Sequence, residues 1–553
     1  MPYSLRVLRA GLRVLGVFLA VVALSACGGP AERETLNARQ LETPRFDPPP
    51  PPTGTALHEL GNDLTGPGGR SLLAKFVPSQ GAALLIALLV MLAVAFDWNR
   101  PGQPRNIELL ALLPIGFLLF EVMRFFALLQ DPIYWQLMDA VFIGIMFFSV
   151  LLLALALMRM KRPHVEPWRP NLPKRALMVL TLVLLSLNVI AGLLREPDDV
   201  GFYTNLGAQR LRERAMFPYG DPLLTNTPGA TYSPILYLSH LAYQVMLVPV
   251  QNPPDPRPEF GVYVLPPILA SQLATVTFHI LGVIGLFIAA RRLIGDDGAW
   301  GVTALYCGSA YVMGVGGDRE LINGMTFASH IAPAAVTMLA FAAVPRPWLS
   351  GALLATATWT LFYPAFFFPA WAGYYWRSRT QLIAFVGGFA IAGLVIGVPV
   401  LLRSAPIEGR GVISTVLHET QGHQQDPNAY GSSPFGFWGQ RGGIRAIFRD
   451  PLVAGQPNTA PAFLLFAAFV VGAFFLARGN TEVQLALLTG ALGIASQLWK
   501  IHGTGVYVTW YYGFLLLGFL GHRGRAFTAE ASTAGTIHEA RTAETRANMN
   551  RPI

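Results

Sequence analysis

Residues 176–203 read ALMVLTLVLLSLNVIAGLL-REPDDVGFY, and this stretch joins a long apolar run to an acidic pair. The apolar part, 176–194, carries no charged side chain, and a helix needs roughly 20 such residues to cross the hydrocarbon core of a bilayer. Asp198 and Asp199 follow the run almost at once. The stretch therefore predicts a membrane-spanning helix that brings two carboxylates to the membrane surface.

The composition of the whole chain also indicates a membrane protein. Of its 553 residues, 53% are hydrophobic and 13% are charged, whereas soluble globular domains carry about 25% charged residues. The net charge of +9 does not indicate a nucleic-acid partner, because Lys and Arg lie mainly in short loops, where they orient helices. We expect an all-α polytopic fold with about 13 transmembrane helices, an N-terminal signal or anchor, and an outward-facing loop with interfacial helices. The expected spans are 80–96, 107–129, 135–158, 176–194, 266–290, 298–316, 327–344, 348–362, 364–376, 382–402, 461–477, 483–499 and 504–521.

The N-terminus has the features of an export signal. Three arginines precede an apolar core at 14–24, and Cys27 follows after Ser25 and Ala26. Residues 1–27 are similar to a bacterial lipoprotein signal, in which Cys27 becomes the lipidated first residue, and an uncleaved anchor helix fits the pattern equally well. Residues 28–78 are rich in Pro and Gly, which favours an extended exported tether without a core.

Loop charges predict the orientation of the spans. The loop 159–175 holds six Lys or Arg residues against one acid, Glu166, so it should be cytoplasmic. Alternation then places 195–265 outside, provided that 232–249 forms an interfacial helix and does not cross. On this basis 79–175 are accessory transmembrane helices, 176–525 form the core, and 526–553 are a disordered cytoplasmic tail.

The segment after the acidic pair carries a family pattern. Its elements are Asp199, Tyr203, Pro218-Tyr219 and Tyr232-Ser233-Pro234. With the topology, they resemble the first external loop of GT-C superfamily glycosyltransferases, closest to the mannosyltransferases of glycosyltransferase family 87. Ser233 departs from the family's Y-P-P, the residues before Pro218 depart from G-x-x-P-Y, and the helices before residue 176 are an addition.

The resemblance implies an activity and its partners. The donor would be a polyprenyl-phosphate sugar, and a mannose-like hexose would pass by inverting displacement to a glycan, lipid or protein acceptor. The site would lie on the periplasmic face of a bacterial inner membrane, in contact with membrane lipids. No Walker or Rossmann glycine pattern occurs in a cytoplasmic loop, which argues against a nucleotide-fuelled pump or a nucleotide-sugar donor.

The chemistry needs a base for the acceptor hydroxyl and cations for the departing phosphate. We expect Asp199 to be the base, with Asp198 as the second candidate. One of the two can instead bind the acceptor or a divalent cation, Mg²⁺ or Mn²⁺, although no resident metal is part of the expected mechanism. The expected substrate-binding residues are Arg195, Tyr203, Tyr219, Tyr232, Asp318, Arg319, Glu320, His330, Lys500 and His502.

Simpler interpretations compete for the same residues. A single charged residue at a helix end more commonly snorkels to the headgroups than binds a ligand. Tyr507, Trp510, Tyr511 and Tyr512 could contact sugar or prenyl groups, but a belt of aromatic residues at the membrane surface is the more common arrangement. The run from His418 to His423 does not fit the helical zinc motif, because its histidines are five residues apart and not four.

Two other functions remain open. A transporter or flippase for lipid-linked glycans requires critical charges at mid-membrane, for which Glu121, Arg124 and His279 are the candidates. We favour an internal ion pair for the first two and a hydrogen-bonded core histidine for His279. A non-enzymatic scaffold would use the tether and the tail, and its outer acids would be dispensable.

Overall fold

The computed structural model describes residues 80–126, 132–162, 167–194, 199–221, 224, 230–247, 268–313, 328–407, 409–422, 436–438, 459–501 and 503–522. Within these ranges the regular elements are all helices, so the predicted all-α class is confirmed. Their bounds are α3 Gln80–Val94, α4 Pro104–Leu110, α5 Leu113–Phe126, α6 Pro132–Lys161, α7 Lys174–Leu194, α8 Asp199–Arg214, α9 Pro234–Leu247, α10 Ile268–Ile294, α11 Asp296–Cys307, α12 Ala310–Met313, α13 Ala328–Ala342, α14 Pro347–Thr358, η4 Tyr363–Phe367, α15 Phe368–Tyr375, α16 Arg379–Leu402, α17 Val412–Leu417, η5 His418–Gly422, α20 Ala460–Leu476, α21 Glu482–Leu498 and α22 Thr509–Leu520.

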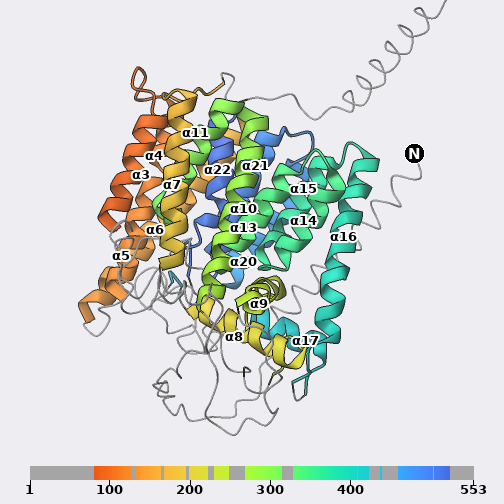
Figure 1. Ribbon diagram of the computed structural model, residues 1–553. Helices are drawn as coiled ribbons and strands as arrows, with labels where there is room; N and C mark the ends of the chain where they lie inside the picture. Colours follow the sequence, from red (N-terminus) through yellow and green to blue (C-terminus); the bar gives the residue numbers. More distant parts are fainter. Residues whose placement is uncertain are drawn as a thin grey trace, which may run out of the picture.

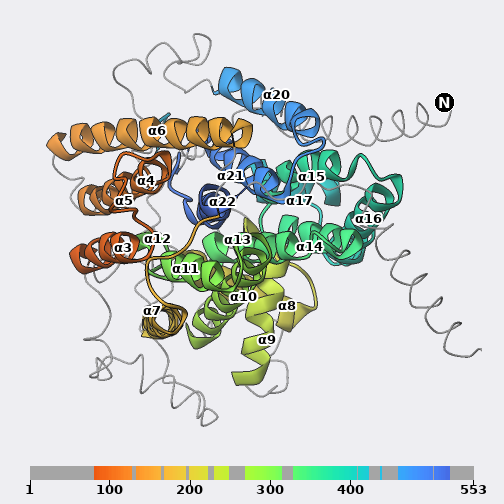
Figure 2. The same cartoon turned by 90° about the horizontal axis from the view of Figure 1, so that it is seen from above.

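Several of these helices are suited to a bilayer. Four are long and apolar enough to cross it, namely Gln136–Lys161, Lys174–Leu193, Leu269–Ile294 and Arg379–Leu402. Other apolar helices are shorter than a full span, so the count of 13 stays a prediction. Helix α22 lies at the centre of the bundle, and every one of its residues is buried among its neighbours (Figure 2).

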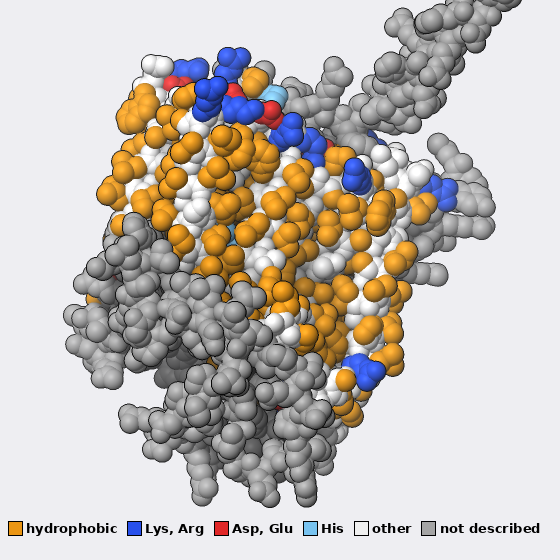
Figure 3. Space-filling model, viewed as in Figure 1, with side chains coloured by type: hydrophobic (Ala, Val, Ile, Leu, Met, Phe, Trp, Pro, Cys, Tyr) orange, Lys and Arg blue, Asp and Glu red, His pale blue; other side chains and the backbone are white. Residues whose placement is uncertain are grey.

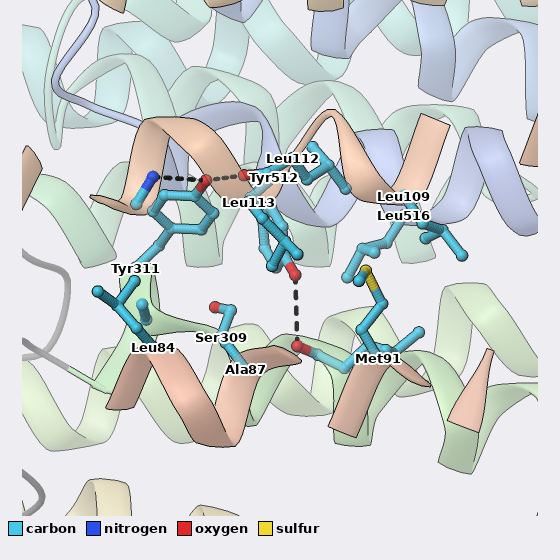
Figure 4. A pocket seen from close by; sticks show the side chains of 13 residues that line it. Leu84, Ala87, Met91, Leu109, Leu112, Leu113, Ser309, Tyr311, Tyr512 and Leu516 are labelled. Atoms are coloured by element: carbon cyan, nitrogen blue, oxygen red, sulfur yellow. Dashed lines mark hydrogen bonds between the residues drawn. The ribbon is translucent and has the colours of Figure 1, made fainter. Parts of the chain in front are cut away.

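Two expected spans are interrupted. The span 107–129 divides into α4 and α5, because Pro114 has no N–H to continue the hydrogen-bonding of α4. The span 298–316 divides into α11 and α12 at Gly308. The Tyr311 side chain of α12 binds the backbone at the break between α4 and α5. Its hydroxyl donates to the Leu112 carbonyl and accepts from the Gly116 N–H at 3.1 Å (Figure 4).

The same contact lies beside a small cavity between α3–α5 and the helices α11, α12 and α22 (Figure 4). Its volume of about 20 Å³ is enough for roughly one water molecule. Residues of α3–α6 and of the helices after residue 174 belong to one hydrophobic cluster, so α3–α6 pack directly against the later helices.

Basic side chains gather at one end of the bundle, above an apolar band (Figure 3). Arg291 and Lys174 both contact Asp296, at 2.6 and 3.3 Å, which joins α10, α7 and α11 there. Arg292 donates to Glu482 at 2.6 Å and so brings the start of α21 to the same end. The helices α8, α9 and α17 lie at the opposite end and cross the direction of the bundle (Figure 1).

The pair α14–α16 shows how closely helices approach in this bundle. A Cβ atom at Gly351 would lie 2.0 Å from the Phe385 carbonyl oxygen, and one at Gly388 would lie 2.0 Å from that of Trp348. Small residues at such crossings let two backbones pack in contact, which is the usual way in which helices associate in membranes. The other face of α16 is apolar and exposed, as membrane contact requires.

Candidate functional site

The helices α8, α9 and α17, at the end of the bundle opposite Arg291 and Arg292, form a platform built around the turn that leads into α9 (Figure 1). The Tyr219 hydroxyl donates to the Tyr232 carbonyl at 2.6 Å, and the Tyr232 N–H donates to the Tyr237 hydroxyl at 3.1 Å. Pro234 then opens α9 at a position where its missing N–H costs nothing. The family-like motif Tyr232-Ser233-Pro234 is thus held by two fully buried tyrosines.

Backbone contacts join this platform to the end of α16. The Phe217 N–H donates to the Arg403 carbonyl at 2.7 Å, and the Ala405 N–H donates to the Tyr219 carbonyl at 3.1 Å. Gly220, the residue after Tyr219, has a φ of 74°, and a Cβ atom there would lie 2.1 Å from the Ala405 carbonyl oxygen. The turn therefore needs glycine both for its conformation and for the close approach.

Buried polar contacts fix α8 and α9 to their surroundings. Arg210 donates to Asp221 at 3.0 Å and to Glu213 at 3.1 Å, which ties α8 to the turn that follows it. His240 lies against the Leu236 carbonyl at 2.8 Å through Nδ1 and against the Ser271 hydroxyl at 3.1 Å through Nε2. Because a carbonyl only accepts, Nδ1 carries the proton, and burial lowers the pKa of His240 to about 4, so the ring is neutral.

A buried lysine lies in the turn between α21 and α22. Lys500 is 8% exposed, and its Nζ lies 4.2 Å from the ring centre of Tyr507 and 5.4 Å from that of Trp510. In the described part of the chain it has no carboxylate partner. Burial lowers the pKa of Lys500 to about 7, and within the described residues its charge is stabilised by the two aromatic faces.

The turn around Lys500 is shaped by one amide side chain. Gln497 donates from Nε2 to the Tyr507 carbonyl at 3.0 Å and accepts from the Tyr507 N–H at 2.9 Å. Gly503 and Gly505 have φ values of 65° and 77°, which lets the backbone reverse within a few residues. The backbone of the turn that follows Lys500 is therefore fixed by the fold.

Further aromatic rings extend the wall beside the lysine. The His330 ring contacts the Tyr507 ring edge-on, with 4.7 Å between the ring centres. Trp510 stacks between Tyr507 and Tyr363, with ring-centre distances of 4.3 and 3.9 Å. Across the described residues, the Trp510 indole N–H and the Tyr363 hydroxyl are buried and lack a hydrogen-bond partner. A buried cation and two unused polar groups in one cluster suit a ligand that is anionic and can accept hydrogen bonds.

The first turn of α13 joins this lysine cluster to the platform. Ala328 and Ile331 pack in one hydrophobic cluster with Val200 of α8, while His330 contacts Tyr507. Both α13 and α21 have their other ends at the basic side, where Arg292 contacts Glu482 and the Ala342 carbonyl. The lysine cluster and α8 therefore lie together at the opposite end.

The structure brings together two of the predicted site residues, His330 and Lys500. It places Tyr203, Tyr219 and Tyr232 in the adjoining platform. Asp199 is the first residue of α8, and its side chain is not among those described. The other predicted residues lie outside the described residues, namely Arg195, Asp198, Asp318, Arg319, Glu320, His502 and Cys27.

Three interpretations from the sequence are wrong. Lys500 does not snorkel to the headgroups, because its side chain is buried. Trp510, Tyr511 and Tyr512 do not form an exposed belt, since none is more than 6% exposed. His279 is a core histidine but not a hydrogen-bonded one within the described residues, because both of its ring nitrogens are buried and unpartnered. The proposed partner of Glu121 is not tested, since the Arg124 side chain is not described.

Two residues of this end were not predicted as site residues. Tyr363 lies in a 3₁₀ turn inside an aromatic run that reads as an ordinary span, so the sequence gives no local signal for it. Glu419 lies between the two histidines of the run that does not fit the zinc motif, and no sequence pattern marks this acid as a site residue. Among the described residues no group of three or more His, Cys, Asp or Glu is placed to hold a metal ion.

Comparison of the chain with protein-family models, with curated proteins and with solved structures found no match.

Proposed function

We propose that the protein is an integral-membrane glycosyltransferase of the GT-C kind, which transfers a hexose from a polyprenyl phosphate to an acceptor at the outer face of a bacterial inner membrane. The observation that supports this most is Lys500, a buried cation with no described carboxylate partner, at the end of the bundle where α8 begins with Asp199.

The reaction assigns a task to each of these groups. The acceptor oxygen attacks the anomeric carbon, the bond from that carbon to the phosphate oxygen breaks, and the polyprenyl phosphate leaves with the bonding electrons. Asp199 takes the proton of the acceptor hydroxyl. Lys500 stabilises the charge that grows on the phosphate, and it does so in a dry environment, where a fixed cation is most effective.

The arrangement of charges supports the sidedness of this proposal. Lys and Arg gather at the end opposite α8 and α9 (Figures 1 and 3), and cytoplasmic loops are the ones that carry an excess of these residues. The platform end would then face outward, where polyprenyl-linked sugars are used. The exposed apolar faces of helices such as α16 would let the lipid tail of the donor remain in the membrane.

The test is a donor screen with the purified full chain. Several polyprenyl-phosphate sugars are supplied with an acceptor mixture, and products are identified by mass. Transfer should be lost in Asp199→Asn and in Lys500→Met, and kept in Lys174→Gln, which removes a half-exposed cation at the opposite end. Undiminished transfer in both Asp199→Asn and Asp198→Asn would reject the mechanism.

A transporter is the second candidate, and one observation favours it. His279 lies inside α10, stacked at 6.2 Å on Tyr306, and neither of its ring nitrogens has a partner within the described residues. An unpartnered polar ring in the bundle is typical of an ion or substrate path. Loss of vesicle uptake in His279→Leu, with the outer residues dispensable, would favour transport over sugar transfer.

A further inference from the structure

Glu419 is a buried acid that the mechanism above does not use. It lies in η5, a π-helical turn that directly follows α17, and π-helical turns often mark functional sites. Its side chain is 6% exposed. In the described part of the chain it makes no hydrogen bond or ion pair. A carboxylate buried without donors is costly, and buried acids of this kind cluster at functional sites.

The surroundings of Glu419 belong to the platform. Its charge acts on the hydroxyl groups of Tyr219 and Tyr237, the two tyrosines that hold the turn before α9. Val416, one turn earlier, packs in the same hydrophobic cluster as Val200 of α8. The carboxylate is therefore on the platform side of the first turn of α13, with Lys500 on the other side.

The charges near Glu419 favour a neutral ligand. Burial raises the pKa of Glu419, and the positive charge of Arg410 opposes that rise. Because Arg410 already supplies positive charge near the Glu419 carboxylate, hydrogen-bond donors complete its environment better than a second cation. Hydroxyl groups donate to a carboxylate without adding charge, and they can reach a group that keeps a small exposure.

The chain that leaves Glu419 returns to the lysine cluster. Residues 436–438 pack on the turn that holds Lys500, because the Phe437 N–H donates to Thr504 at 3.2 Å and the Trp438 indole donates to the Leu498 carbonyl at 2.7 Å. Residues 436–438 are thus fixed beside Lys500.

We propose that Glu419 binds the acceptor of the reaction, by accepting hydrogen bonds from the hydroxyl groups of a hexose oligosaccharide, while Lys500 holds the phosphate of the donor. This inference rests on the proposed function. It makes Glu419 a specificity residue for the acceptor, and it divides the site into a hydroxyl-binding half on the α17 side and a phosphate-binding half on the α21–α22 side.

The experiment compares Glu419→Gln with Asp296→Asn, a control that removes an exposed acid at the basic end. Mannotriose serves as the acceptor probe and farnesyl phosphate as the donor probe, and the binding of each is measured by calorimetry on the full chain in detergent. In Glu419→Gln, mannotriose affinity and acceptor kcat/KM should fall about 10- to 100-fold, mainly through KM. Farnesyl phosphate affinity should stay as in the wild type, and the unfolding temperature should not fall, because the variant removes a buried charge. The control should leave the affinity for both ligands unchanged.

The possible results separate the two proposals. Equal mannotriose binding by wild type and Glu419→Gln, or no binding by the wild type, overturns the acceptor assignment. A loss of farnesyl phosphate binding in Glu419→Gln also overturns it, since the acid would then act on the donor or on the fold. If no donor supports transfer but mannotriose binding depends on Glu419, sugar transfer fails and the saccharide site stands.

Discussion

Replacing Lys500 by Met should remove ligand binding and yet stabilise the protein at low pH. Burial shifts the pKa of the amine from 10.5 to about 7, and this difference corresponds to a cost on the order of 5 kcal/mol for the charged form. The two aromatic rings return about 2 kcal/mol or somewhat more. Methionine keeps the length of the stem and can itself pack against aromatic rings.

The expected effect depends on pH in a definite direction. Below about pH 7 both folded and unfolded chains carry the charged lysine, and the variant should be more stable by about 1–3 kcal/mol. Between that pKa and 10.5 the unfolded chain holds a proton that the folded chain has released, so wild-type stability rises with pH. The advantage of Lys500→Met should therefore shrink as the pH rises.

The assay is denaturant-induced unfolding of wild type and variant, followed by the helical circular dichroism signal at about pH 6 and about pH 10. Farnesyl phosphate should protect the wild type at the lower pH and should leave the variant unprotected. A variant destabilised by about 3 kcal/mol or more at the lower pH would refute the reasoning, because that is the effect of breaking a buried ion pair. Lys500 would then be a structural cation whose partner lies in another part of the chain.

Three further predictions concern the scaffold of the site, and each is measured by unfolding in detergent. Gly351→Leu should lower stability by more than about 3 kcal/mol or prevent folding, because its Cβ would lie 2.0 Å from a carbonyl oxygen of α16; an unfolding midpoint equal to wild type would show that the helices separate easily. Tyr219→Phe should cost about 1 kcal/mol by removing the donor to the Tyr232 carbonyl, and a neutral result would mean that water replaces it. Arg210→Met should cost about 1–3 kcal/mol, because the buried Asp221 loses the hydrogen bond to its nearest cation and keeps Arg214 only at 3.9 Å; the double variant with Asp221→Asn should recover part of this loss, and its failure to do so would count against the pair.

The helices themselves were largely predictable from apolar runs between charged loops. The span 176–194 appears as Lys174–Leu194, and 135–158 appears within Pro132–Lys161. The break in 107–129 was missed because its hydrophobicity is continuous, although Pro114 marks it. Hydropathy reports burial in lipid or protein alike, whereas a helix break depends on a backbone hydrogen bond that one residue can remove.

The sequence predicts His330 and Lys500 as candidate site residues but does not predict how deeply they are buried. Both residues are predicted next to the ends of apolar spans, and in the structure both contact Tyr507. Nothing in the sequence indicates that Lys500 is buried, since burial comes from how α21 and α22 pack on Tyr363 and its neighbours. A charge at a helix end looks the same in sequence whether it is solvated or enclosed.

In the proposed function, the first turn of α13 connects the acceptor half of the site to the donor half. Ala328 and Ile331 are packed against α8, and His330, between them in sequence, contacts the ring that covers Lys500. Successive residues of one helical turn thus face the platform and the lysine cluster. The Thr509 hydroxyl donates to the His330 carbonyl at 3.2 Å, which fixes this turn to the start of α22. A shift of α8 on acceptor binding would therefore be transmitted to the lysine through a rigid helix end, and the acceptor and donor halves should bind their ligands cooperatively.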